Sequence, residues 1–149
     1  MLSEYYDIQF DSSESYFFFY SEGSKGRIIK VVRFKKVGDS PYYHLGFGDL
    51  NEEDNSINDI TASDNKDMNK IFTTIAAIVL LFISENPEAW IYAKANSPVK
   101  TRLYRIMLSK NLEMISTNFQ LYGSLKGFWK PFRENSNYTA FLIKRKKND

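Results

Sequence analysis

Hydrophobic and polar residues alternate along the first third of the chain in patterns that are typical of β-strands. One segment is an almost purely aromatic run and another is rich in β-branched residues, and both kinds of residue favour extended structure. Turn sequences that contain glycine separate the segments. We therefore expect a meander of three or four antiparallel strands, formed by residues 5–10, 15–21, 27–36 and 42–47.

A polar, acidic stretch and then a continuous apolar run follow this meander. Residues 48–66 show no periodicity and predict a long loop, whereas residues 71–83 are apolar on every side and predict a helix. Asp64 or Asn65 would cap this helix, with Asp67 in its first turn. Such a helix rises only about 20 Å, less than the bilayer core of about 30 Å. We expect the central helix of a soluble domain and no membrane span.

Helical and extended patterns alternate in the second half of the chain. Residues 90–95 predict a short strand, and the pair Ser97-Pro98 is a typical helix start for residues 99–109. A strand is predicted at residues 113–122, an aromatic loop at residues 123–137, and a last strand at residues 138–144.

The order of these elements predicts a single α+β domain over residues 1–149. We expect a mixed, mostly antiparallel sheet of about six or seven strands packed on two helices. Because the strand at residues 90–95 lies between two helices, the crossover connections imply at least one parallel pairing of strands.

Composition excludes several kinds of site. The chain has no cysteine, which excludes disulfides, thiol nucleophiles and zinc sites with cysteine ligands, and the single His44 excludes multi-histidine metal sites. The acidic residues 49–59 lack the glycine of a calcium loop, so we predict no metal site. Residues 1–10 hold acids but no base, unlike a secretory signal, so we expect a cytoplasmic protein.

Charges are arranged in blocks, although the net charge is only +2. Residues 1–22 and 49–67 are acidic, whereas residues 24–36, 94–110 and the C-terminal tail are basic. These blocks would suit self-association or a charged protein partner. Nucleic-acid binding is an alternative, with the aromatic side chains of Tyr122, Phe128 and Trp129 as stacking surfaces. The pI near 8.6 is low for a dedicated nucleic-acid binder.

The start of the second helix is a candidate site for a small anionic ligand. The hydroxyl of Ser97, the free N–H groups of the first turn, and Lys100, Arg102 and Arg105 could bind an anion there. The alternative is that Ser97 only caps the helix and that the basic residues form a solvated helix face. Charged helix faces are the norm, so the alternative is favoured.

Lys30 is a second candidate ligand-binding residue. It shares one face of its strand with Ile28 and Val32, so its amine points in the same direction as hydrophobic side chains. Buried lysines are rare unless paired, and a lowered pKa can make them catalytic. The favoured alternative is an edge lysine whose ammonium reaches water. A partner such as Asp49 would instead make it a structural ion pair.

Residues 91–96, followed by Leu103-Tyr104, resemble the second half of the acyl-CoA-dependent acetyltransferase fold. The resemblance implies acyl-CoA as cofactor, Tyr104 as general acid, and a role for Asn96 at the end of its strand. Residues 63–67 depart from the family's glycine-rich loop, because they contain no glycine and two carboxylates that would repel phosphates. The family's N-terminal helices are also missing.

Most of the chain resembles an uncharacterised family of small proteins from Bacteroidetes-type bacteria. The resemblance implies no activity. It rests on four motifs, Gly23-x-x-Gly26-x-Ile28-x-Lys30-x-Val32-x-Phe34, Phe47-Gly48-Asp49, Asn65-x-Asp67 and Thr101-Arg102-Leu103-Tyr104.

Taken together, these patterns favour a non-catalytic domain that binds a protein partner or a small anionic ligand, and that needs no cofactor. An acetyltransferase-like domain that uses Tyr104 and Asn96 with acyl-CoA is one alternative. A nucleic-acid-binding module that uses the basic residues 27–36 and 100–105 is the other.

Overall fold

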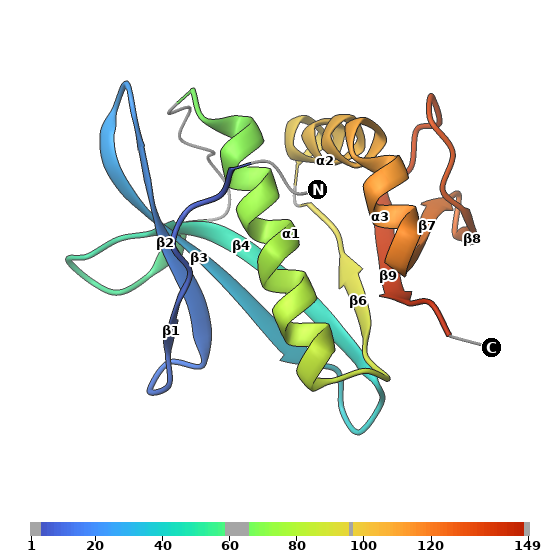
Figure 1. The fold of residues 1–149 in the computed structure, drawn as a ribbon, viewed down its shortest axis with the longest axis horizontal. Coiled ribbons are helices and arrows are strands. Elements are labelled where there is room, and N and C mark those ends of the chain that lie inside the picture. The colour runs from blue at the N-terminus through green and yellow to red at the C-terminus, as the bar shows by residue number, and fades with distance from the viewer. Residues whose placement is uncertain (1–3, 59–65, 96, 148–149) are drawn as a thin grey trace. The chain divides into compact units, whose positions relative to one another are not determined.

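The computed structural model describes residues 4–58, 66–95 and 97–147 (Figure 1). Within this part the chain forms a mixed nine-stranded sheet and three helices, which confirms the α+β class and exceeds the predicted element count. The strands are β1 (Gln9–Asp11), β2 (Tyr16–Gly23), β3 (Gly26–Lys36), β4 (Tyr42–Leu50), β5 (Ile57–Asn58), β6 (Trp90–Ala93), β7 (Phe119–Leu125), β8 (Phe128–Pro131) and β9 (Ala140–Arg145). The helices are α1 (Met68–Glu85), α2 (Pro98–Lys110) and α3 (Leu112–Asn118).

The chain divides into two compact units. Unit 1 comprises Met1–Phe34 and Gly46–Phe82, and unit 2 comprises Lys35–Leu45 and Ile83–Asp149. Strands β3 and β4 pass from one unit into the other, and each unit is described by itself below.

Unit 1 is an antiparallel meander covered by one helix. Strands β1, β2, β3 and β4 are neighbours in chain order, and β5 pairs with β4. Helix α1 packs on the meander through the ring of Phe82, which stacks on the ring of Phe34 with centroids 4.0 Å apart. Phe19, Val32 and Ile78 are fully buried. One side of α1 therefore packs in the core of unit 1, while Leu81 on the same helix stays exposed, so α1 is less completely covered than predicted.

Helix α1 is longer than the sequence pattern predicted, at 18 residues rather than residues 71–83. It begins after Asp67, whose carbonyl oxygen accepts the N–H of Ile71 at 2.9 Å, so Asp67 precedes the first turn. The predicted caps Asp64 and Asn65 lie outside the described residues.

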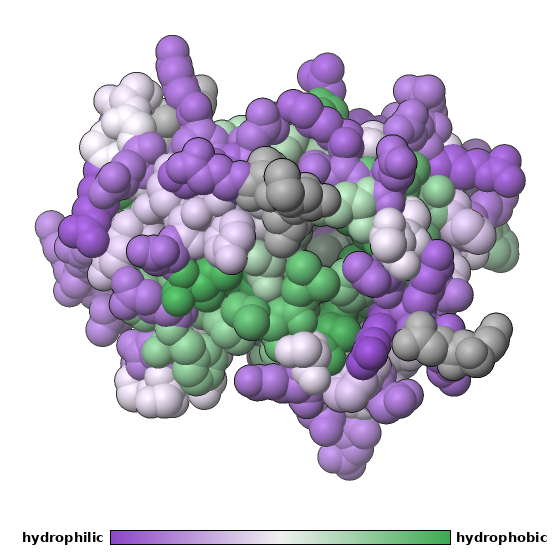
Figure 2. All heavy atoms as spheres, viewed as in Figure 1, coloured by the Kyte–Doolittle hydropathy of each residue, from purple (hydrophilic) through white to green (hydrophobic). Residues whose placement is uncertain are grey.

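At 18 residues, α1 is long and apolar enough by composition to cross a membrane, which the shorter predicted helix was not. Core helices of soluble proteins can have the same length and composition, and α1 packs on the meander through Phe82. Figure 2 shows hydrophobic surface over α1, where Leu81 is 48% exposed.

Unit 2 orders its strands β4-β6-β9-β7-β8. Strands β4 and β6 are parallel, with Tyr42 opposite Trp90, which confirms the parallel pairing predicted for the crossover strand. The other pairings of the unit, β6 with β9, β9 with β7 and β7 with β8, are antiparallel. Helices α2 and α3 lie on one face of these strands (Figure 1), where the ring of Tyr104 lies 6.2 Å from that of Phe141. Ile91 and Phe141 are fully buried in this layer.

Two segments of unit 2 differ from the sequence prediction. Residues 113–122 were expected to form one strand, but α3 occupies the first part and β7 the second. Asn111 both ends α2 and precedes α3, and its side chain donates to the Met107 carbonyl at 2.7 Å instead of capping α3. The expected aromatic loop at residues 123–137 contains β8, because Lys126 and Gly127 have positive φ angles that suit a two-residue hairpin turn.

The close approach of Tyr138 to Gly123 yields a first prediction. A Cβ atom at Gly123 would collide with the Tyr138 ring, so Gly123→Ala should lower the free energy of unfolding by roughly 1–3 kcal/mol in urea denaturation. Gly46→Ala is the matched control, because its Cβ would meet nothing closer than the Arg33 carbonyl oxygen at 3.8 Å. Equal effects of the two substitutions would contradict this packing.

Candidate functional site

The start of α2 is where the sequence suggested a site for a small anionic ligand. The Ser97 hydroxyl accepts the backbone N–H of Lys100 at 3.2 Å, and Pro98 occupies the first helical position. Lys100 is only 6% exposed, whereas Arg102 is exposed. Positions two apart on a helix point in different directions. Arg105 donates from Nη1 to Asn137, and its Nε is buried without a partner. The structure therefore does not bring these basic side chains together around Ser97.

Tyr104 and Asn96 are the residues implied by the acetyltransferase resemblance. Tyr104 lies on α2 and is half-buried, with its ring packed near Phe141 of the sheet. Asn96 lies outside the described residues. The geometry therefore shows a packing contact for Tyr104 and does not bear on Asn96.

Lys30 forms a buried ion pair within unit 1. Its Nζ lies 2.5 Å from Oδ1 of Asp49, and the side chains are 2% and 16% exposed. Lys30 is opposite Phe19 on β2, and its Nζ lies 5.9 Å from the ring centroid of Phe47. The structural ion pair with Asp49, one of the alternatives raised by the sequence, is present, and Lys30 is not the edge lysine that the sequence favoured.

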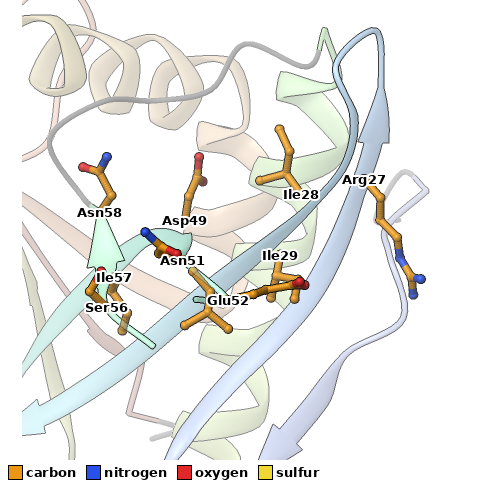
Figure 3. A pocket seen from close by; sticks show the side chains of 10 residues that line it. Arg27, Ile28, Ile29, Asp49, Asn51, Glu52, Ser56, Ile57 and Asn58 are labelled. Carbon is orange, nitrogen blue, oxygen red and sulfur yellow. The ribbon is translucent and has the colours of Figure 1, made fainter. Parts of the chain in front are cut away.

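A cavity of about 670 Å³ lies in unit 1 beside this ion pair (Figure 3). Its lining is mainly polar, and Figure 3 shows Asp49, Asn51, Glu52 and Asn58 on one side and Arg27 on the other. The Arg27 guanidinium lies 3.7 Å over the ring of Tyr20. The described residues contain no group of three metal-ligating side chains, in this cavity or elsewhere.

A second polar cluster of unit 1 surrounds Asp67. Its Oδ2 accepts the hydroxyl of Tyr6 at 2.6 Å and that of Ser21 at 2.5 Å, while its Oδ1 is buried without a partner. Burial and the hydrogen bond to Asp67 raise the pKa of Tyr6 above its ordinary value. This cluster connects the start of α1 with β2 and the N-terminal segment, so its role is structural.

The face of the unit 2 sheet that points away from α2 carries most of the unit's exposed aromatic rings. Phe141 of β9 contacts α2, so the neighbouring positions of that strand point to the other side. Directly opposed residues on the paired strands share that side. We call this surface the aromatic face. Its strand positions are Tyr42, His44, Trp90, Tyr92, Gln120, Tyr122, Ser124, Trp129, Pro131, Ala140, Leu142 and Lys144.

One chain of rings crosses the aromatic face from β4 to β7. The ring centroid of Trp90 lies 5.7 Å from that of Tyr42 and 6.2 Å from that of Tyr122. Between the strands of Trp90 and Tyr122, the Nζ of Lys144 lies 4.3 Å from the Trp90 ring centroid. The Tyr122 hydroxyl donates to the side chain of Gln120 at 3.2 Å. The ammonium of Lys144 thus lies over one ring of this chain.

A second chain of rings joins His44, Tyr92 and Trp129. The centroids of His44 and Tyr92 are 5.5 Å apart, and those of Tyr92 and Trp129 are 5.9 Å apart. Trp129 reaches Tyr92 from β8 because Ser124 and Ala140, the residues between them, are small. Both small residues are buried beneath this contact, at 8% and 4% exposure.

Two further lysines extend the aromatic face. Lys94 directly follows β6, where continued alternation with Trp90 and Tyr92 would place it on the same side, and it is exposed. The N–H of Val37 donates to the carbonyl of Tyr42, a pairing that places Lys35 opposite His44 on the same side. The strand positions that form this face, all among the described residues, hold no Asp or Glu.

The two units carry opposite charge. Unit 2 contains 14 Lys and Arg against 6 Asp and Glu, a formal net charge of +8. Unit 1 contains 6 Lys and Arg against 12 Asp and Glu, a formal net charge of −6. The near-neutral charge of the whole chain therefore conceals a strongly basic unit that carries the aromatic face.

Sequence reasoning named only part of this surface. Tyr122 and Trp129 lie on it, whereas Phe128, the third suggested stacking residue, precedes Trp129 on β8 and points to the opposite side. Trp90 and Tyr92 were missed. Their alternation with Ile91 and Ala93 was the available signal, because it separates one aromatic side of the strand from one aliphatic side.

The ion pair of Lys30 and Asp49 yields a second prediction. Asp49→Leu leaves a buried ammonium without its counter-charge, so it should lower the free energy of unfolding by roughly 3–5 kcal/mol in urea denaturation. The double variant Lys30→Met with Asp49→Leu should recover most of that loss, because no buried charge is left over. Glu4→Gln, which removes the exposed pair with Lys70, is the control and should change little. A double variant no more stable than the single one would contradict this account.

Comparisons with known proteins place the chain in a family. No curated protein and no solved structure matches it. A family model, described as a family of unknown function (DUF6934), matches residues 2–146, which confirms the predicted resemblance to an uncharacterised family. The chain belongs to this family of unknown function.

Proposed function

We propose that this chain is a non-catalytic binding protein, and that unit 2 binds an anionic partner through the aromatic face. The observation that supports the proposal most strongly is the division of charge, with +8 on the unit that bears this face. A basic unit attracts polyanions at long range and raises their rate of association. The lysines at positions 35, 94 and 144 would then contact the partner directly.

The geometry of the remaining candidate groups also favours binding over catalysis. Nζ of Lys30 lies 2.5 Å from Oδ1 of Asp49, so this side chain is engaged in an ion pair inside unit 1. The contact described for Tyr104 is the packing of its ring near Phe141 of the sheet.

An acyl-CoA-dependent activity is the second candidate. Strand β6 follows α1 and precedes α2 in the chain, and it pairs in parallel with β4. This order supports the resemblance to the acetyltransferase fold. The carboxylate of Asp67 at the start of α1 argues against it, because it places negative charge where the resemblance implies a pyrophosphate.

Self-association is the competing form of binding. A unit of net charge −6 and a unit of +8 on one chain could pair with those of a second copy. Such a dimer would occupy the same basic surface. Measuring the molecular mass of the protein at each salt concentration distinguishes self-association from binding of another anionic partner, because only self-association gives a dimer that dissociates as salt rises.

Heparin, a polyanion without bases, tests the proposed function. We expect the protein to bind a heparin column at low salt and to elute as salt rises, because the contacts are screened charges. Reversing two lysines of the aromatic face, Lys35→Glu with Lys94→Glu, should move elution to clearly lower salt. The matched control Arg102→Glu with Lys147→Glu removes the same charge from α2 and the tail, and should shift elution less.

Three results would contradict this prediction. One is the absence of retention at low salt, and another is an equal shift for the two double variants. The third is a rise in melting temperature with millimolar acetyl-CoA but not with adenosine, which would support the acyl-CoA candidate instead.

A further inference from the structure

We propose that the anionic partner is a single-stranded nucleic acid whose bases stack on the aromatic face. This inference rests on the proposed function, since it specifies the polyanion that the basic unit binds. It adds a role for the rings, which a simple polyanion would not require.

The rings of the aromatic face are arranged so that bases can reach them. The planes of the four ring pairs are inclined to each other by 31° to 75°. The rings are therefore not stacked in parallel, an arrangement in which each ring would cover the face of its neighbour. Tyr42 and Trp129, at the ends of the two chains of rings, remain 42% and 43% exposed. Stacking on such rings tolerates any base, because every base has a π-face.

The cations lie where a phosphate backbone would need them. Lys144 lies over the Trp90 ring, Lys35 is opposite His44, and Lys94 follows the last strand residues of β6. No carboxylate interrupts the strand positions of this face in the described residues, so nothing there repels phosphates. Bases stacked on the rings would bring the backbone past Lys144 on the central strand β9 and past Lys35 and Lys94.

The same composition argues against a protein partner on this face. Protein interfaces are enriched in aromatic residues and arginine but depleted of lysine, whereas here every cation is a lysine. Of the aliphatic residues on the face, Leu142 and Ala140 are buried, at 7% and 4% exposure, and Pro131 at the edge on β8 is exposed. A partner would therefore meet rings and ammonium groups.

The shape of the surface selects a single strand over a duplex. Reading duplex DNA requires a helix or a narrow two-stranded ribbon that enters a groove, and its bases are stacked on one another. The aromatic face is a broad sheet surface with five strands, which no groove of that width admits. Unpaired bases can be splayed onto a sheet of this kind.

The test compares neighbouring aromatic residues on opposite sides of β8. We expect a fluorescently labelled oligothymidylate of about twelve nucleotides to bind the full chain in an anisotropy titration at low salt. Trp129→Ala should weaken this binding by roughly five- to a hundred-fold and leave heparin elution unchanged. Phe128→Ala is the matched control, because Phe128 is 71% exposed but points away from the aromatic face, and it should change neither measurement.

Each other outcome would overturn the inference in a distinguishable way. Unchanged affinity for the oligonucleotide in Trp129→Ala would remove the role of the rings while leaving polyanion binding intact. Equal loss in Phe128→Ala would contradict the assignment of the face, and tighter binding of a duplex would contradict single-strand selection. Binding of neither heparin nor oligonucleotide would end the proposed function together with this inference. Tyr42→Ala, at the other end of the face, guards against misfolding of one variant and should also weaken binding.

Discussion

Both faces of the sheet in unit 2 carry side chains that need to be covered. In the described residues, the helices α2 and α3 lie on one of these faces (Figure 1). Helix α2 covers the face that carries Ile91 and Phe141. On the other face, aromatic rings from four strands lie over Leu142 and over the small residues Ser124 and Ala140. The rings therefore cover the residues beneath them, while Tyr42 and Trp129 stay 42% and 43% exposed.

The two units carry opposite net charge, and the aromatic face lies on the basic one. The acidic residues of the N-terminal segment and of the stretch after Asp49 belong to unit 1, and most of the basic residues belong to unit 2. An aromatic surface on a basic unit is the basis of our proposal that a single-stranded nucleic acid binds there. In unit 1, by contrast, the central charge of Lys30 is neutralised locally by Asp49, which favours a structural role.

Local patterns in the sequence predicted the elements that depend on local physics. The β-branched residues of β3 and the Ser97-Pro98 start of α2 were recognisable because propensity and capping act within a few residues. Helix α3 was missed because its first residue directly follows Asn111, the residue that ends α2. The aromatic face was only partly found, since β9 lies between β6 and β7 and this order cannot be read from neighbouring residues. Likewise, the charge blocks could be counted, but their division between two units required the fold.

The intrinsic fluorescence of the protein gives the most direct test of the account, because its two tryptophans, Trp90 and Trp129, both lie on the aromatic face. Titration of unlabelled oligothymidylate into the single-tryptophan variants Trp90→Phe and Trp129→Phe would report on each ring separately. Stacking of bases on the face predicts a saturable change in emission from the remaining tryptophan in both variants. The contradicting result is a constant tryptophan emission in variants that still bind the labelled oligothymidylate in the anisotropy titration. It would place the nucleic acid elsewhere on the protein.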